Sequence, residues 1–500
     1  MSDRSDPKDW IACGPRGAAS LERAVDEITR WAGEYLASLE ERPVRDDAAR
    51  WGDVLDRIGA HPPERGIGPD ALGALVDETD RVVTDRLVHW QSPRFFAYFP
   101  CSNSVPAIAA ELMSAVVNVN GMLWSTSPAC TELEVRMMDW CAEMLGIDDA
   151  FTFERSERGG GCIQGTASEA TLAALCAARR RCTSRGVDRS KVCVYASDQA
   201  HSSVVKAAMV AGLADDADDR SRVRLIRTDD AQRMDPRALA HAIERDLSAG
   251  LVPAMVALTA GTTSTGAVDP TREVLGVLES RARTRPWIHI DAAWAGAACV
   301  CPEHRWVLDA HEHADSVCIN PHKWLLTNFD CDLFWVRDRD ALTESMSITP
   351  AYLRDGSGAE TVDYRDWHVP LGRRMRALKL WFVIRCFGVA GLRDSIEGHI
   401  ALARRVEAWV RETEGVEMVG ERALGLVCFR LGAGDDATRR LVERVNARGR
   451  VMITGSEVPI GPGGANRAIA RVSVGTPGVD DGAVDTLLDE LNAAAGAPVE

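Results

Sequence analysis

The chain has 500 residues, of which 46% are apolar and 26% are charged, a composition typical of a globular protein that forms a core. Lysine and arginine number 58 against 74 aspartate and glutamate residues, and the resulting net charge of −16 disfavours nucleic acid and anionic membranes as partners. No apolar run approaches the roughly 20 residues of a membrane helix, and the first residues hold no apolar signal core. We therefore expect a cytoplasmic protein without a membrane segment.

The cysteine and histidine spacings predict neither a disulfide framework nor a metal site. None of the fourteen cysteines forms a Cys-x-x-Cys pair, and the nearest neighbours, Cys299 and Cys301, are expected to be buried, inert thiols. His311 and His313 are two residues apart, whereas a helical zinc motif places its imidazoles four residues apart on one face.

Residues 1–105 are predicted to form an N-terminal helical segment. Apolar residues recur at helical spacing from Leu21 to Leu36, and a second helical pattern runs from Pro69 to about His89. Neither helix carries chemistry, so the segment fits a packing or dimerisation arm. The aromatic stretch 92–100 that follows fits either a core or interface cluster or the wall of an aromatic-lined pocket.

Residues 106–395 are predicted to form a large α/β domain. Helices are expected at 107–117 and 127–145. The glycine-rich stretch from Gly159 is expected to turn into a helix that ends near Arg181, with small hydroxyl residues at its start. A helix N-terminus of this kind binds anions such as phosphate. The stretch is not Gly-x-Gly-x-x-Gly, so it does not indicate a dinucleotide fold.

Short strands then alternate with helices, which predicts a mainly parallel sheet. The expected strands are 191–196, 223–227, 254–259, 287–291, 316–319 and 332–336. Ligands of such sheets bind beyond the carboxyl ends of the strands. The polar residues that follow these strand ends are Asp198, His201, Ser202, Thr263, Asp291, His322 and Lys323.

Lys323 is the residue around which these features are arranged. It follows a strand and a Pro-His turn and precedes Trp324, a setting that suits a reactive lysine better than a solvated one. Asp291 ends the preceding strand. A lysine that holds pyridoxal phosphate (PLP) as a Schiff base and an aspartate that pairs with the pyridine nitrogen are what a PLP enzyme needs. The flat ring of His201 could stack on the cofactor.

The remaining chain predicts a loop and a smaller domain. Residues 338–370 are expected to form a loop in which Tyr352 is either a surface residue or an acid on a mobile lid. An apolar helix, 377–387, is expected to end at Gly388 and Gly391. Residues 396–500 are predicted to form a small αβ domain with strands at 424–431, 451–453 and 468–474.

Several motifs resemble those of a known family. The matching stretches are 92–100, 127–134 (SPACTELE), 163–171, 197–203 (SDQAHSS), 289–296, 320–330 (NPHKWLLTNFD) and 370–376. In these motifs the chain resembles the group II PLP-dependent decarboxylases, above all the aromatic-L-amino-acid decarboxylases. The resemblance implies a fold-type I (aspartate-aminotransferase-like) homodimer with active sites built by both subunits.

The resemblance also implies roles for individual residues. By motif position, Lys323 would carry the cofactor, Asp291 would pair with its ring nitrogen, and His201 would stack on the ring. Tyr352 would stand on a mobile loop and return a proton to the substrate, which implies an amine product, since phenylalanine at this position goes with aldehyde formation in the family. The other cofactor contacts implied are Thr166, Ala167, Ser168, Thr263, Ala293, Asn320 and His322.

The substrate pocket implied by the resemblance favours an indole. Its residues would be Trp90, Tyr98, Phe99, Pro100, Asn120, Met122 and Gly372. In plant relatives, glycine at the position of Gly372 accompanies indolic substrates, so tryptophan or a substituted tryptophan is the favoured substrate. Asn120 and Met122 depart from the apolar and aromatic residues of animal members. The alternatives are a decarboxylase of tyrosine, dopa, phenylalanine or another amino acid, an aromatic aldehyde synthase, and a non-catalytic relative.

Overall fold

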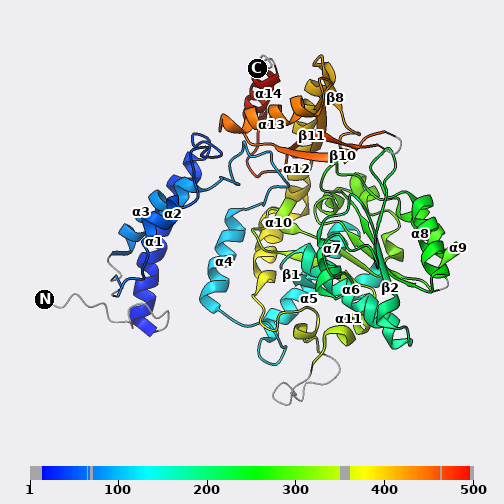
Figure 1. The fold of residues 1–500 in the computed structure, drawn as a ribbon. Helices are drawn as coiled ribbons and strands as arrows, with labels where there is room; N and C mark the ends of the chain where they lie inside the picture. Colours follow the sequence, from blue (N-terminus) through cyan, green and yellow to red (C-terminus); the bar gives the residue numbers. More distant parts are fainter. Residues whose placement is uncertain are drawn as a thin grey trace.

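The computed structural model describes residues 14–64, 66–67, 71–282, 284–348, 361–461 and 464–495. Within this part of the chain, a seven-stranded sheet and a four-stranded sheet organise the fold (Figure 1). A helical arm, α1–α3, extends away from the body that holds the two sheets (Figure 1).

The larger sheet has the order β1-β7-β6-β5-β4-β2-β3. Its strands are β1 (Gly160–Gln164), β2 (Val192–Ser197), β3 (Val223–Ile226), β4 (Val252–Thr259), β5 (Trp287–Asp291), β6 (Ser316–Ile319) and β7 (Asp332–Val336). Neighbours from β3 to β6 are parallel, and β7 is antiparallel to both β6 and β1. The predicted mainly parallel α/β sheet is confirmed.

Helices cover both faces of this sheet, because alternate residues of its buried strands point to opposite faces and both faces are apolar. One face packs against α5 (Pro128–Leu145), α8 (Pro236–Ser248), α9 (Thr271–Arg281) and α12 (Arg376–Glu412). The other face packs against α6 (Ala167–Ser184), α7 (Ser203–Val210) and α11 (Arg339–Met346).

The smaller sheet is antiparallel, with the order β10-β11-β9-β8. Its strands are β8 (Val416–Met418), β9 (Leu426–Leu431), β10 (Thr454–Pro459) and β11 (Asn466–Ser473). Helices α13 (Asp435–Ala447) and α14 (Asp481–Ala495) share a buried core with it. The long helix α12 connects the two sheets (Figure 1).

Three local predictions were wrong. Residues from Gly160 form strand β1, where a turn was expected; a Cβ on Gly161 would lie 2.4 Å from Met138 Cε, so this glycine permits close packing. Arg339–Met346 form helix α11, where the stretch 338–370 was expected to be a loop. Residues 451–453 precede strand β10, and Val451 and Ile453 are buried in the small-domain core. The predicted break at Gly388, in contrast, is confirmed: this residue is non-helical, with φ 62° and ψ 176°, and α12 consists of two helical parts that meet there at a kink.

The arm consists of α1 (Gly14–Ser38), α2 (Asp53–Ile58) and α3 (Leu72–Val82). Trp31 Nε1 on α1 donates to Asp80 Oδ1 on α3 at 2.9 Å and so joins the two helices. Several apolar arm side chains remain exposed: Ile28, Leu36, Leu55, Ile58 and Leu75. None of the helices in the described ranges is long and apolar enough to cross a membrane.

Candidate active site

The polar residues at the ends of the strands lie along one edge of the larger sheet, because parallel strands bring their carboxyl ends together. Backbone hydrogen bonds join the segments after β5 and β6: Asn320 N donates to Ala293 O at 2.9 Å, and Ala292 N donates to Cys318 O at 3.0 Å. The short helix α10 (Pro321–Trp324) starts directly after β6 and carries Lys323. The backbone therefore holds the segments of Asp291 and Lys323 side by side.

Lys323 stands over an aromatic wall. Its Nζ lies 5.6 Å from the centre of the Phe99 ring. Phe99 stacks on Trp294 at 4.2 Å, and Trp294 stacks on Trp324 at 5.1 Å between ring centres. Burial lowers the pKa of Lys323, although the Asp291 carboxylate opposes this effect. A lysine of lowered pKa is more often neutral and therefore more nucleophilic.

Asp291 is 7% exposed and has a fixed orientation. Its Oδ1 accepts a hydrogen bond from Ala293 N at 3.0 Å and lies 3.9 Å from the donating Cys318 thiol. Cys318 Sγ is also 3.9 Å from His289 Nε2, and His289 Nδ1 lies 2.9 Å from Ser316 Oγ. Burial lowers the pKa of His289 to about 4, so this imidazole is neutral near pH 7. The carboxylate is thus supported by neutral groups behind it.

His201 follows β2 and precedes α7, and its Nδ1 accepts from Ser203 N at 3.1 Å. His201 is exposed. Loss of hydration lowers the pKa of His201; the nearby Asp291 raises it and Lys323 lowers it further. His201 thus stands at the same sheet edge as Lys323 and Asp291, and its lowered pKa favours the neutral imidazole.

The start of α6 fits a phosphate group. Thr166 is the residue before the helix and makes no side-chain cap to it, Ala167 is the first helical residue, and Ser168 is exposed. The first N–H groups of a helix have no intrahelical partner and face an anion together with the helix dipole. Thr263 is exposed in the turn after β4.

His322 holds the chain on the far side of Lys323. Its Nδ1 accepts from Cys331 N at 3.0 Å, directly before β7. Burial, followed by the positive charge of Lys323, lowers the pKa of His322 to about 3. A neutral imidazole is required here, because a protonated Nδ1 could not accept this bond.

The expected pocket residues form two patches. In the first patch, Trp90 stacks on Tyr98 at 5.5 Å between ring centres. The Phe99 ring lies below Lys323 Nζ, which is 5.6 Å from the ring centre, and the neighbouring Pro100 is buried. The second patch brings together Asn120, Met122 and Gly372. In it, Asn120 Nδ2 lies 3.6 Å from Met122 Sδ and 3.8 Å from the position of a Cβ on Gly372.

A buried ion pair supports the second patch. Arg373 binds Glu134 through two nitrogens at 2.5 and 3.1 Å, and both side chains are 1% exposed. Arg373 N also donates to Asn120 Oδ1 at 2.9 Å. Tyr352 lies outside the described residues.

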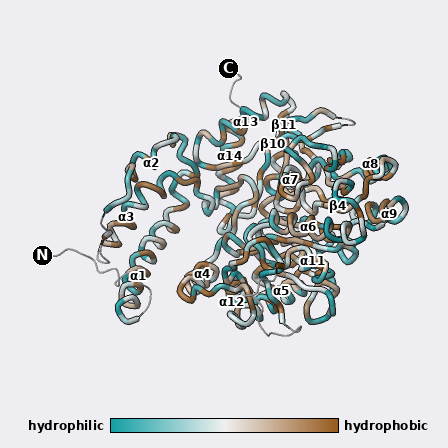
Figure 2. The backbone as a smooth tube through the Cα atoms, turned by 60° about the horizontal axis from the view of Figure 1, so that its bottom comes forward, coloured by the Kyte–Doolittle hydropathy of each residue, from teal (hydrophilic) through white to brown (hydrophobic). Residues whose placement is uncertain are grey.

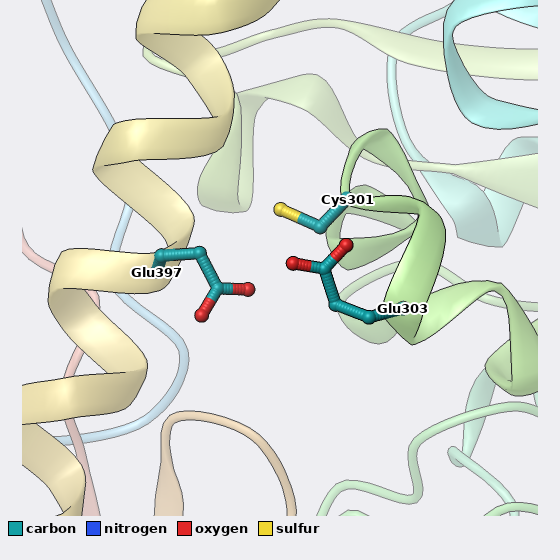
Figure 3. Close-up of side chains that lie close together, drawn as sticks. All are labelled: Cys301, Glu303 and Glu397. Atoms are coloured by element: carbon teal, nitrogen blue, oxygen red, sulfur yellow. The ribbon is translucent and has the colours of Figure 1, made fainter.

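One group of potential metal ligands occurs in the described part of the chain, away from Lys323. The side chains of Cys301, Glu303 and Glu397 point into a common space (Figure 3), with their ligand atoms within 4.8 Å of one another. His304 Nε2 already contacts Glu397 Oε1 at 2.7 Å, and Glu303 is exposed. The contact between His304 and Glu397, with the Cys301 thiol beside it, accounts for this arrangement.

Sequence reasoning did not identify three polar residues beside the site, namely His289, Cys318 and Asp332. The available signal was a polar residue at a buried strand position, and the most marked case is Asp332 at the start of an apolar strand. Which group each of them faces is set by tertiary contacts.

A lysine of lowered pKa, an oriented carboxylate on the adjacent strand and an open helix N-terminus on one sheet edge fit PLP. These features define a fold-type I PLP-dependent enzyme. The profile described as "Pyridoxal-dependent decarboxylase conserved domain" matches residues 57–432.

Similar proteins and solved structures support the same assignment. Aromatic-L-amino-acid decarboxylase of Cavia porcellus is 40% identical over 449 residues, which cover 87% of this chain and 90% of that protein. The structure of Oryza sativa TDC with PLP and tryptamine matches with a TM-score of 0.89 and 37% identity, covering 97% of this chain and 99% of that one. Rhodiola rosea 4-hydroxyphenylacetaldehyde synthase matches with a TM-score of 0.86 and 34% identity, covering 97% and 98%. The chain belongs to the PLP-dependent decarboxylases, in the family of the aromatic-L-amino-acid decarboxylases. Its cofactor is pyridoxal 5′-phosphate.

Proposed function

We propose that the protein decarboxylates an aromatic L-amino acid, tryptophan or a ring-substituted tryptophan, to the corresponding tryptamine and CO2. The observation that carries this proposal is the position of Lys323, whose amine has a lowered pKa and stands over the Phe99–Trp294 wall beside Asp291. This combination places cofactor chemistry against a surface that suits an aromatic side chain.

The bound cofactor supplies an electron sink for the bond to the departing carboxylate. Lys323 would hold the cofactor through its amine, Asp291 would bind the ring nitrogen, and His201 would lie on the ring face. The phosphate would be held by Ala167, Ser168 and Asn320. Four further residues would support the cofactor site: Thr166, Thr263, Ala293 and His322.

The chain's own residues then orient the substrate and move protons. Lys323, whose pKa is lowered, would give up the cofactor to the substrate amine and take it back after the reaction, and the Asp291 carboxylate would favour a proton on the ring nitrogen. Tyr352 would return a proton to the α carbon after CO2 has left. The stacked rings of Phe99 and Trp294 exclude water from this side of the site.

The second patch favours an indole. Gly372 has no side chain, and the space where its Cβ would stand has Asn120 Nδ2 as its nearest atom, at 3.8 Å. In the similar Oryza sativa structure the bound product is tryptamine. Trp90, Tyr98, Phe99 and Pro100 would line the opposite side of the pocket.

We further propose a homodimer in which the patch of Asn120, Met122 and Gly372 completes the site of the partner subunit. Helix α4 (Val105–Val117) exposes Val105, Ile108, Leu112, Met113, Val116 and Val117. Brown, hydrophobic turns of α4 are visible in Figure 2. Together with the exposed apolar side chains of the α1–α3 arm, this surface suits a self-complementary interface.

A product assay across a substrate panel tests the proposed reaction. The holoenzyme is incubated with tryptophan, substituted tryptophans, tyrosine, dopa and phenylalanine, and amine, CO2 and hydrogen peroxide are measured. We expect the highest kcat/KM with an indolic substrate. A phenolic amino acid as the best substrate would contradict the assignment.

The same assay with Tyr352→Phe tests the proton return and the aldehyde synthase alternative, which the similarity to the Rhodiola rosea synthase raises. We expect amine formation by this variant to fall roughly 100-fold or more, as for the loss of a general acid, and peroxide to appear. An undiminished rate of amine formation would rule out this role for Tyr352.

A further inference from the structure

Three buried polar side chains form a row across the ends of β1, β7 and β6. Gln164 pairs directly with Asp332, and because Ile319 pairs with Leu333, the next position places Asn320 opposite Asp332. The three side chains are 2%, 0% and 3% exposed. They form a continuous polar row at the cofactor edge of the sheet.

The row lies on the face of the sheet that packs against α6. Gln164, Asn320 and Asp332 are each two residues from a residue buried on that face, namely Cys162, Cys318 and Phe334. Residues two apart on a strand share a face, and Asn320 is itself extended, with φ −95° and ψ 97°. The helix start proposed for the phosphate belongs to the same layer.

The row contains acceptors without donors. Gln164 Oε1, Asn320 Oδ1 and both carboxyl oxygens of Asp332 are buried and have no hydrogen-bond partner. Leaving a buried carboxylate without any donor is very costly, whereas a neutral carboxylic acid carries a donor of its own. A proton on Asp332 would supply one donor to this row, and the NH2 group of the Gln164 amide would supply a second.

Burial and two of the four charges around Asp332 favour that proton. The carboxylates of Asp291 on β5 and Glu169 on α6 oppose its ionisation, and Lys323 on α10 and Arg376 on α12 favour it. Burial is the largest effect, and it raises the pKa of Asp332 well above its usual value. The Cys318 thiol on β6, whose own pKa is raised, also faces Asp332.

We propose that Asp332 is a neutral carboxylic acid that donates its proton to Asn320 Oδ1 and thereby leaves both Nδ2 hydrogens of Asn320 for the cofactor phosphate. This inference rests on the proposed role of Asn320. An ionised Asp332 would instead accept from Nδ2 and turn Oδ1 toward the phosphate, where two negative groups would meet. The Gln164 amide is held by a 3.7 Å contact from Nε2 to Cys162 Sγ. Rotated by 180°, this amide would direct its NH2 group toward the second oxygen of Asp332.

Asp332 is therefore a positioning residue for phosphate binding. Two variants of similar size separate its hydrogen bonding from its packing. Asp332→Asn is neutral and keeps one donor and one acceptor, whereas Asp332→Leu keeps neither. Thermal unfolding of the full chain shows whether each variant is folded.

The first measurement is the affinity of the apoprotein for pyridoxine 5′-phosphate, which has the ring and phosphate but no aldehyde to react with Lys323. We expect Asp332→Asn to bind within roughly threefold of the wild type and Asp332→Leu to bind roughly tenfold more weakly, the effect of one lost buried hydrogen bond. Pyridoxine without phosphate is expected to bind all three proteins alike. Equal weakening by Asn and Leu would overturn the proposal.

The second measurement is of the proton itself. Infrared difference spectra of wild type against Asp332→Asn should contain the carbonyl band of a protonated carboxyl group. On the alkaline side, wild-type affinity for pyridoxine 5′-phosphate should fall as Asp332 ionises, and Asp332→Asn should lack this fall, because all other groups are shared. Absence of the band, or identical pH profiles, would overturn the proposal. Wild-type decarboxylation would still stand in that case.

Discussion

At the scale of single residues, burial and a few nearby charges decide the chemistry of the site. Lys323 has a lowered pKa because it is buried, and Asp291 opposes this change without cancelling it. His201 and His322 are neutral for the same main reason, loss of hydration. The site therefore holds a nucleophilic amine and neutral imidazoles at a pH where these groups in water would carry more positive charge.

Replacement of Lys323 tests its proposed role as the residue that holds the cofactor. Lys323→Met should abolish the visible absorption of the bound cofactor and lower decarboxylation roughly a thousandfold or more, because the covalent attachment is lost. Lys206→Met, a change at an exposed lysine on α7, is the matched control and should leave both unchanged. Retention of the visible band by Lys323→Met would contradict the assignment.

Sequence reasoning singled out Lys323, Asp291 and His201 because reactive residue types stood at or within four residues of the ends of apolar strands. It did not find Asp332 or Cys318, whose importance depends on which strands become neighbours. The pairing of β7 with both β6 and β1 brings Asp332 beside Gln164 and Asn320. Local periodicity carries no information on such pairing.

At the scale of elements, one buried ion pair joins three parts of the fold. Glu134 on α5 accepts from Ile163 N on β1 at 2.8 Å and from Arg373, just before α12. Arg373 also lies over the Tyr364 ring, 4.5 Å from its centre. The pair thus fixes the segment that carries Gly372.

Glu134→Gln should lower the free energy of unfolding by about 3–5 kcal/mol, because it leaves the buried Arg373 without its counter-charge. The control is Glu154→Gln, in the exposed Arg136–Glu154 pair of 2.7 Å. That change should cost less than about 1 kcal/mol. Urea unfolding measures both values, and equal losses would contradict the role of the buried pair.

Glycine-based predictions were wrong at the start of β1 and correct inside α12. Glycines 159–161 predicted a turn, but they form and precede β1 because β1 packs tightly against Met138 and Trp335. Gly388 predicted a helix end, and its backbone is indeed non-helical, so that α12 is kinked at this residue. Local propensity was sufficient at Gly388, whereas tertiary contacts, which cannot be read from local propensity, determined the outcome at β1.

At the scale of the whole molecule, exposed apolar surface points to a second subunit. The arm extends from the body (Figure 1), and α4 leaves one apolar face uncovered while its other face packs on α12. In the dimer that we propose, these surfaces would be buried and the patch of Asn120, Met122 and Gly372 would complete the partner's site.

Complementation tests the shared site. Lys323→Met and Gly372→Trp subunits, each inactive as homodimers, are co-expressed with different tags. With random pairing, half of the dimers are mixed and each has one intact site, so the co-expressed population should recover about a quarter of wild-type activity and purified mixed dimers about half. A monomer in sedimentation, or no recovery in purified mixed dimers, would contradict the proposal.

The central claim is that this site converts an indolic amino acid to its amine. The most direct test is the product balance of the holoenzyme with L-tryptophan. We expect equal amounts of tryptamine and CO2 without hydrogen peroxide. Peroxide and aldehyde in amounts that match CO2, or no CO2 from tryptophan while another aromatic amino acid is consumed, would contradict it.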